Sequence, residues 1–259
     1  MNTMENISKL SIIASSSLVI MTILFSYWQK LNLEKDIIFS ILRAIVQLVA
    51  IGYVLEYVFG YKNPIFTTLF VIFMIFNAAQ NVSERVKNIK NGMAISFLSI
   101  SFGTAITLAV LLLSKTIRYE AYQIIPICGM IISNAMIALS LAYKKMTNDF
   151  KNKKEEIETK LSLGADTLES SINIIRDCIK TGMLPTIDKA KTLGIVSLPG
   201  MMTGLILAGS SPIEAIKYQI IVTFMFLSAT STSSFIACYL SYKSFFNKRK
   251  QLVDLNQKN

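Results

Sequence analysis

The stretch AYQIIPICGMIISNAMIALSLAY, residues 121–143, contains no charged side chain. A helix of this length rises about 35 Å, enough to cross about 30 Å of hydrocarbon. Its apolar residues run continuously and do not alternate as barrel strands do. The sequence therefore predicts an all-α polytopic membrane protein with about seven transmembrane helices. Five further uncharged stretches are Leu10–Gln29, Asn63–Ser83, Asn91–Ser114, Thr192–Ile213 and Tyr218–Tyr242, and a seventh, Ile37–Tyr61, is interrupted only by Arg43 and Glu56 towards its ends.

Composition and charge agree with this fold class. Of the 259 residues 53% are hydrophobic, the mean hydropathy is +0.51 and the formal net charge is +10. If the stretches cross the membrane in turn, twenty Lys and Arg residues fall on one side and five on the other, with Arg43 inside a span. The positive-inside rule then predicts an external N-terminus and a cytoplasmic C-terminus in the cell membrane.

The whole chain, residues 1–259, is expected to form a single permease domain. Residues 144–191 form its longest polar connection, predicted to be a cytoplasmic coupling segment. Apolar residues recur at helical spacing from Leu161 to Met183, Gly164 breaks the pattern, and Asp166 with Glu169 has the spacing of a capping box. Gly182 and Pro185 are expected to end this helix. The segment either docks a partner that drives transport or merely lies against the membrane surface.

The sixth stretch carries the signal for a broken helix. Leu198, Pro199 and Gly200 interrupt it, because proline removes a backbone hydrogen bond and glycine loosens the helix. Transporters use broken helices near the substrate path, whereas an ordinary kink with close helix packing is the alternative.

Polar residues within the spans are candidates for the transport pathway. Arg43 and Gln47 share a helix face, and Arg43 either reaches lipid phosphates or pairs with an acid such as Glu84 inside the bundle. A second polar face lies at the inner end of the third span, where its residues line a pathway or bond to other helices. Its residues are Asn77, Gln80, Asn81 and Glu84.

Sulfur and amide side chains mark two further spans. Met130 and Asn134 lie in residues 121–143, and Met201 with Met202 follows the break at Pro199. Thioethers and freed carbonyls offer weak metal coordination, although methionines also pack as ordinary apolar residues. The chain has no histidine and only three cysteines, which favours neither a closed metal site nor a disulfide framework. The sequence therefore predicts no particular metal and no set of metal ligands.

The sequence contains no Walker A loop and no dinucleotide fingerprint. If ATP drives this protein, the ATPase is a separate chain that binds ATP-Mg, and this chain binds no cofactor. A self-sufficient secondary transporter is the main competing interpretation. A membrane-embedded enzyme is less favoured, because no nucleophile–base pair or metal motif is present, so the chain is not expected to be an enzyme.

The segment SLPGMMTG, residues 197–204, is quite specific. Together with Ile125–Met130, Asn134 and Glu158–Gly164, it resembles the membrane permease subunits of the Fet-type iron-export ABC transporter family, which includes plant aluminium-tolerance proteins. The resemblance covers residues from about 43 to 242. It implies a permease that exports iron or another metal ion as a homodimer with separate cytoplasmic ABC ATPase subunits. No nucleic-acid partner is expected, because in a membrane protein the net charge of +10 reflects cations gathered on the cytoplasmic side.

The coupling segment has a weaker resemblance of its own. In permeases of ABC importers, a Glu-Ala-Ala motif followed by Gly and a later Leu-Pro contacts the ATPase. Here Glu158 and Gly164 have the matching offset and Leu184-Pro185 follows, but Thr159 and Lys160 replace the alanines. The resemblance implies that Glu158, Gly164, Asp166, Glu169, Leu184 and Pro185 couple the permease to its ATPase.

Overall fold

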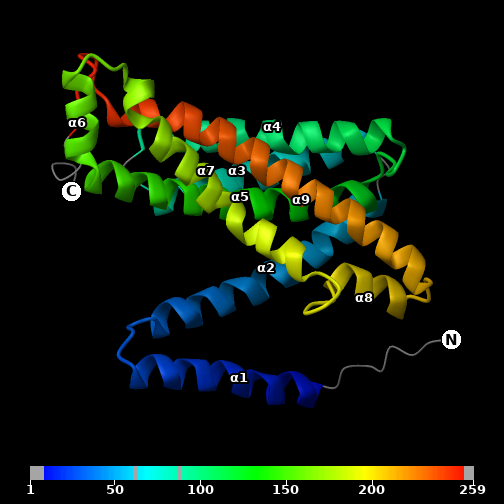
Figure 1. Ribbon diagram of the computed structural model, residues 1–259. Coiled ribbons are helices and arrows are strands. Elements are labelled where there is room, and N and C mark those ends of the chain that lie inside the picture. The colour runs from blue at the N-terminus through cyan, green and yellow to red at the C-terminus, as the bar shows by residue number, and fades with distance from the viewer. Residues whose placement is uncertain (1–8, 61–62, 87–88, 254–259) are drawn as a thin grey trace. The chain divides into compact units, whose positions relative to one another are not determined.

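The computed structural model describes residues 9–60, 63–86 and 89–253. These residues form helices and two isolated bridges without a strand, which confirms the all-α prediction for the described part. The chain divides into two compact units, residues 1–61 and 62–259. The helices are α1 (Lys9–Trp28), α2 (Glu34–Gly60), α3 (Pro64–Arg85), α4 (Gly92–Leu113), α5 (Ala121–Asn152), α6 (Lys154–Ser162), α7 (Thr167–Thr192), α8 (Gly200–Leu207) and α9 (Pro212–Ser241), and a 3-10 turn η1 (Tyr242–Phe245) follows (Figure 1).

Five described helices, α2, α3, α4, α5 and α9, are long and apolar enough to cross a membrane. Helix α1 adds a shorter apolar segment at Ala14–Trp28. The protein is therefore a multi-pass membrane protein, as predicted, while the count of seven spans and the orientation stay predictions. Of the cations counted for orientation, Lys62, Lys87 and Lys258 lie outside the described residues.

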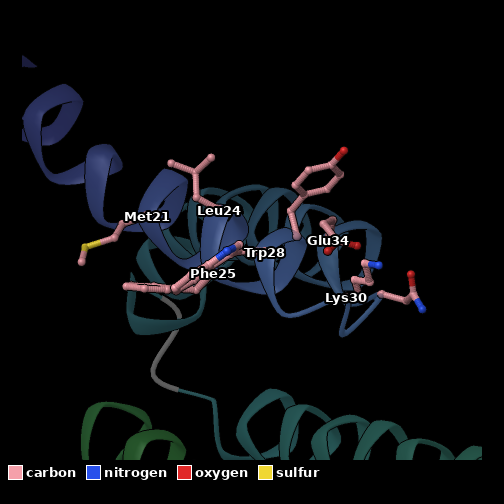
Figure 2. Close-up of a pocket in the computed structure, with 8 residues that line it drawn as sticks. Met21, Leu24, Phe25, Trp28, Lys30 and Glu34 are labelled. Carbon is pink, nitrogen blue, oxygen red and sulfur yellow. The ribbon is translucent and has the colours of Figure 1, made fainter.

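The first unit is a hairpin of α1 and α2. Ser26 Oγ donates to Glu34 Oε1 at 2.8 Å and accepts from the Leu33 backbone N–H at 3.3 Å, which holds the turn together. A hollow of about 920 Å³ opens at this turn, and Figure 2 shows Phe25 and Trp28 near the end of α1 with Lys30 and Glu34 beside them. An aromatic ring next to a lysine at a helix end is typical of a membrane–water interface.

The second unit is a helical bundle around α5. Helix α5 packs against α3, α7 and α9, while α4 packs against α3 and α9, and α8 lies against α9 (Figure 1). Helix α5 has 32 residues and therefore extends about 48 Å, well beyond a hydrocarbon core of about 30 Å. The part of α5 that exceeds the hydrocarbon thickness begins near Lys144 and is followed by α6.

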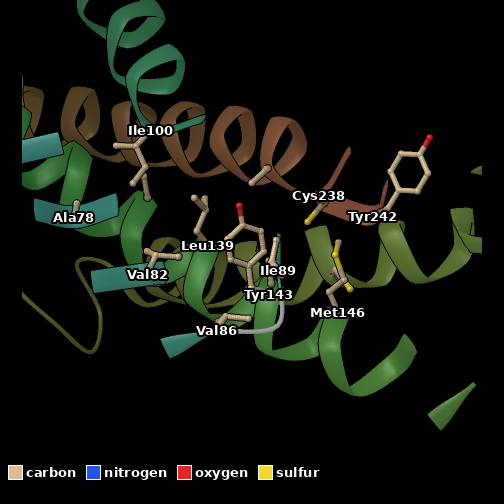
Figure 3. Packing of buried hydrophobic residues seen from close by; sticks show 14 of the residues in the cluster. Ala78, Val82, Val86, Ile89, Ile100, Leu139, Tyr143, Met146, Cys238 and Tyr242 are labelled. Carbon is tan, nitrogen blue, oxygen red and sulfur yellow. The ribbon is translucent and has the colours of Figure 1, made fainter. Parts of the chain in front are cut away.

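The largest apolar cluster of the described residues lies between α3, α4, α5, α7 and α9. Figure 3 shows Leu139 and Tyr143 of α5 beside Val82 of α3 and Ile100 of α4. The buried Tyr143 hydroxyl accepts a hydrogen bond from Ser96 Oγ at 3.4 Å, which gives this polar group a partner inside the core. The cluster fixes the bundle near the end of α5 that continues into α6.

Small residues allow the closest helix approaches. A Cβ added to Gly182 of α7 would lie 2.7 Å from the Ala138 carbonyl oxygen of α5, and one on Gly103 of α4 would lie 2.2 Å from Ser233 Oγ of α9. Helices in membranes associate through such small residues because their backbones can then approach closely. Gly182 therefore lets the backbone of α7 pack directly against α5.

The coupling segment differs from the expectation at one end. The turn at Gly164, with φ +94°, and the Asp166–Glu169 capping box are confirmed. The expected stop at Gly182 and Pro185 is wrong, because α7 continues to Thr192. Packing against α5 and α9 overrides the weak helix propensity of these two residues.

Candidate functional site

A cavity of about 260 Å³ lies among α5, α7, α8 and α9. Its wall brings together the middle of α5, the last turns of α7, the start of α8 and the first half of α9. The lining residues are Met130, Ser133, Asn134, Thr186, Lys189, Ala190, Leu193, Pro199, Gly200, Met201, Gln219, Val222, Thr223 and Phe226. Because a water molecule takes about 30 Å³, the space suits a small solute.

The cavity lies at a break between two helices. Helix α7 ends at Thr192, whose carbonyl oxygen accepts from the Val196 backbone N–H at 3.0 Å in a tight turn. The chain then becomes extended at Pro199, with φ −63° and ψ 144°, before α8 begins at Gly200. The predicted break in this stretch is confirmed, because Thr192–Ile213 holds only the eight-residue α8 and the start of α9.

The two ends at this break differ in their backbone hydrogen bonding. The Thr192 carbonyl accepts a hydrogen bond within the turn, whereas no side chain caps the N-terminus of α8. Within the described residues, the N–H groups of Gly200 and Met201 have no partner. The first N–H groups of a helix have no acceptor within the helix, so these two are available to a ligand. The break therefore offers donors to the cavity.

Polar side chains of α5 and α9 also face the cavity. Asn134 Nδ2 donates to the Met130 carbonyl at 2.7 Å, and Thr223 Oγ1 donates to the Gln219 carbonyl at 2.9 Å. Gln219 is only 8% exposed, and its Oε1 accepts no hydrogen bond among the described residues. A buried polar atom without a partner is costly, so Gln219 is an unfavourably buried amide in the wall of the cavity.

Lys189 is the charged residue of the lining. Its Nζ lies 5.5 Å from the centre of the Phe226 ring, a cation–π distance, and the lining residues include no Asp or Glu. The adjacent Asp188 bonds to Lys191 Nζ at 3.1 Å instead. The cavity therefore carries net positive charge.

The structure brings five of the twelve predicted pathway residues to this cavity. They are Met130, Asn134, Pro199, Gly200 and Met201. Met202 follows in α8 but is outside the lining. The role of all twelve in transport stays a prediction.

The remaining pathway candidates lie elsewhere. On α3, Asn77, Gln80 and Glu84 are exposed, and Gln80 Nε2 donates to Glu84 Oε1 at 2.9 Å, while Asn81 is half-buried. Arg43 is exposed in the first unit. Gln47 is likewise exposed there.

Sequence reasoning missed Lys189, Gln219, Thr186, Thr223 and Phe226. Lys189 belongs to the predicted cytoplasmic segment 144–191, and it lines the cavity together with Met130 and Asn134 of α5. Gln219 carried a usable signal, since it is an amide in the otherwise uncharged stretch Tyr218–Tyr242. The exact end of the cytoplasmic segment at Lys191 stays a prediction.

A second feature is the elbow between α6 and α7. Leu163 is 83% exposed at its tip, next to Gly164. Lys250 Nζ bonds to Asp166 Oδ1 at 2.8 Å, and this contact holds the pKa of Asp166 below its usual value and raises the pKa of Lys250. The bond ties the C-terminal segment to the elbow.

The predicted coupling residues do not form one surface. Glu158 pairs with Lys154 at 3.8 Å on α6, and Glu169 Oε2 accepts from the Asp166 backbone N–H at 3.1 Å at the start of α7. Leu184 and Pro185 lie about 25 Å further along α7, beyond the elbow. Helix α7 thus joins the elbow to the cavity.

Comparisons with known proteins give consistent matches. Residues 9–246 match the family described as "Uncharacterised protein family (UPF0014)". The chain is 50% identical over 249 residues to "Probable iron export permease protein FetB" of Escherichia coli (strain K12), covering 96% of each protein. It is 35% identical to "UPF0014 membrane protein STAR2" of Oryza sativa subsp. japonica, over 93% of this chain and 85% of the relative. It is 36% identical to "Protein ALUMINUM SENSITIVE 3" of Arabidopsis thaliana, over 92% and 88%. No solved structure matches the chain.

Proposed function

Because the chain belongs to the UPF0014 family, as its SLPGMMTG segment predicted, we propose that it is the permease subunit of an ABC transporter. It exports iron or another metal ion, and the ATPase that drives it is a separate cytoplasmic subunit that binds ATP-Mg. The metal and the direction are carried over from the name of the Escherichia coli relative. Two copies of the chain assemble with two ATPase chains, and each copy is one permease domain.

The observation that supports this proposal best is the cavity at the break between α7 and α8. A transport path needs polar groups at membrane depth, and backbone outside helices is tolerated there only where it lines a cavity or is buried in protein. The cavity lies against the middle of α5, which belongs to the uncharged stretch 121–143. Its position is that of a solute site in a transporter.

Helix α7 supplies a mechanical link between the two features. It starts at the elbow with Thr167 and ends beside the cavity, and its 26 residues extend about 39 Å. The exposed Leu163 and the turn at Gly164 present an apolar tip for a groove in the ATPase. A movement of the ATPase on ATP binding would reach the cavity through this helix.

Ion pairs fix the elbow end of α7 to α5. The buried Asp149 of α5 bonds to Lys145 Nζ at 2.8 Å, and Lys153 Nζ lies 3.9 Å from both Asp149 Oδ2 and Asp177 Oδ2 of α7. Because Asp149 is buried, its contact with Lys145 is less screened than a surface pair. The elbow and α7 are therefore expected to move together with the end of α5.

Transport by the reconstituted pair tests the proposal. The full chain and a candidate ABC ATPase subunit would be placed in liposomes, and ⁵⁵Fe transport measured with ATP, without ATP, and with a Walker-lysine variant of the ATPase. We expect transport that requires ATP hydrolysis and both chains. Transport by this chain alone, driven by an ion gradient, would contradict the proposal and establish a secondary transporter.

A further inference from the structure

We propose that the helical bundle carries a binding site for an anionic phospholipid. A groove of about 440 Å³ lies between the start of α4 and the end of α9, two helices that pack side by side (Figure 1). Lys90 and Lys243 hold the lipid headgroup, and an acyl chain follows the groove along the two helices. This inference goes beyond the proposed function, because it concerns the bilayer around the protein and not the transported solute.

The α4 side of the groove changes from polar to apolar along the helix. Lys90 and Asn91 lie just before α4, and Ala94, Ile95 and Leu98 continue the same face at spacings of three and four. Leu98 is 44% exposed and lies about 9 Å from the start of α4. Since α4 is long and apolar enough to span the membrane, the apolar part of this face belongs to the hydrocarbon region.

The α9 side of the groove has the same order and is fixed to the α4 side. Leu240 of α9 is exposed, and Lys243 and Ser244 of η1 follow it within one turn. Ser244 Oγ donates to the Lys90 carbonyl oxygen at 3.2 Å. This hydrogen bond brings the two lysines to the same end of the groove, although they lie far apart in the sequence.

The polar end of the groove is cationic and has no counter-ion of its own. Its lining includes two lysines and no Asp or Glu, and neither lysine forms an ion pair with a described residue. At the elbow, by contrast, the cations share their hollow with carboxylates, and Lys250 is bonded to Asp166 at 2.8 Å. The groove beside α4 therefore favours an anion from outside the chain.

An anionic phospholipid matches both parts of the groove. Its phosphate accepts charge-assisted hydrogen bonds from the lysines, and its acyl chain covers the exposed apolar faces of α4 and α9. Inorganic phosphate would contact the polar end alone, and an acidic protein surface would not extend into the membrane span. Basic pockets between membrane helices bind such lipids on the cytoplasmic side, to which the positive-inside rule assigns both lysines.

Quenching of tryptophan fluorescence by brominated lipids measures lipid association at the groove itself. The substitution Leu98→Trp is made in a chain whose single native tryptophan is removed by Trp28→Phe. The purified full-length chain is placed in mixtures of phosphatidylglycerol and phosphatidylcholine in which either lipid is brominated. Ile137→Trp in the same background is the control, because Ile137 is 48% exposed on α5 and lies outside the lining.

We expect the association constant for phosphatidylglycerol to exceed that for phosphatidylcholine about tenfold at Leu98→Trp, and the two to be about equal at Ile137→Trp. Either Lys90→Gln or Lys243→Gln should lower the ratio about threefold, and the double variant should lower it to about one. Lys248→Gln removes the same charge from an exposed position outside the lining and should leave the ratio unchanged.

Equal ratios at Leu98→Trp and Ile137→Trp would overturn the inference, because the groove would then select no lipid. A loss with Lys248→Gln as large as that with Lys243→Gln would also contradict it, since only the general surface charge would be acting. If the double lysine variant keeps its lipid ratio but no longer binds the ATPase in a pull-down, the lysines bind an acidic protein surface instead. The lipid measurements use this chain alone, so the lipid site and ATP-driven transport can fail separately.

Discussion

Gly182 is the position where a single methyl group should disturb the link between elbow and cavity. In Gly182→Ala the new Cβ would lie 2.7 Å from the Ala138 carbonyl oxygen, 3.2 Å from Ala142 Cβ and 3.2 Å from Ser234 Oγ. Only the serine hydroxyl can rotate away, because the other two atoms belong to the backbone and first side-chain carbon of α5. Helix α7 must therefore shift to accept the methyl.

The magnitude follows from two opposing terms. Overpacking costs about 1–3 kcal/mol, and contact with rigid atoms at 2.7 Å and 3.2 Å puts this case in the upper part of the range. Alanine gains about 1 kcal/mol over glycine within a helix. The net loss is then about 1–2 kcal/mol, which corresponds to a melting temperature lower by about 2–8 °C for a chain of this size.

Thermal unfolding of the detergent-purified chain, followed by size-exclusion fluorescence, measures this shift. Gly204→Ala is the control, since nothing lies within 4 Å of a Cβ there and the substitution should be neutral or slightly stabilising. An unchanged or raised melting temperature for Gly182→Ala would refute the close seating of α7 on α5.

Four further substitutions test other parts of the account. Gly164→Val forces a β-branched residue to φ +94°, which strains the turn between α6 and α7. The variant should therefore bind the ATPase more weakly in a pull-down while it still inserts into the membrane. Normal binding would show that the elbow only covers the surface of the bundle. Lys250→Gln should raise the pKa of Asp166 towards its ordinary value in an NMR carboxyl titration. Because this pKa is lowered in the folded state, the bond stabilises the fold at pH values above the unfolded pKa of about 4, and this stabilisation is lost as the pH falls through the folded pKa. An unmoved pKa of Asp166 in Lys250→Gln would exclude the bond. Met201→Leu should leave metal-stimulated ATPase activity within about twofold, as should Met202→Leu, because leucine keeps the approximate volume of methionine; a larger loss confined to Met201→Leu would establish sulfur coordination.

The membrane fold was predictable because its signal is local. Long uncharged stretches lead directly to helices that can span a bilayer, and Pro199 with Gly200 marked the break that the structure contains. The capping box at Asp166 was equally local, since its two residues are three positions apart.

The assembly of the cavity was not predictable in the same way. Met130 and Met201 were singled out by residue type, but Lys189 gathers with them only because α7 continues past Pro185 and packs along α5. That packing depends on Gly182 opposite Ala138, a contact between residues 44 positions apart. Sequence periodicity carries no information on such a pairing.

Blocking the cavity tests the central claim most directly. Ala190→Trp places a large ring in the lining, whereas Ile195→Trp places the same ring at a position that is 90% exposed and outside it. Iron transport would be measured in liposomes that contain each variant with its ATPase, after gel filtration confirms the assembly. The account predicts that Ala190→Trp lowers transport by at least about tenfold and that Ile195→Trp leaves it unchanged, because the ring occupies the solute space. Wild-type transport by Ala190→Trp in an intact assembly would show that the solute crosses elsewhere.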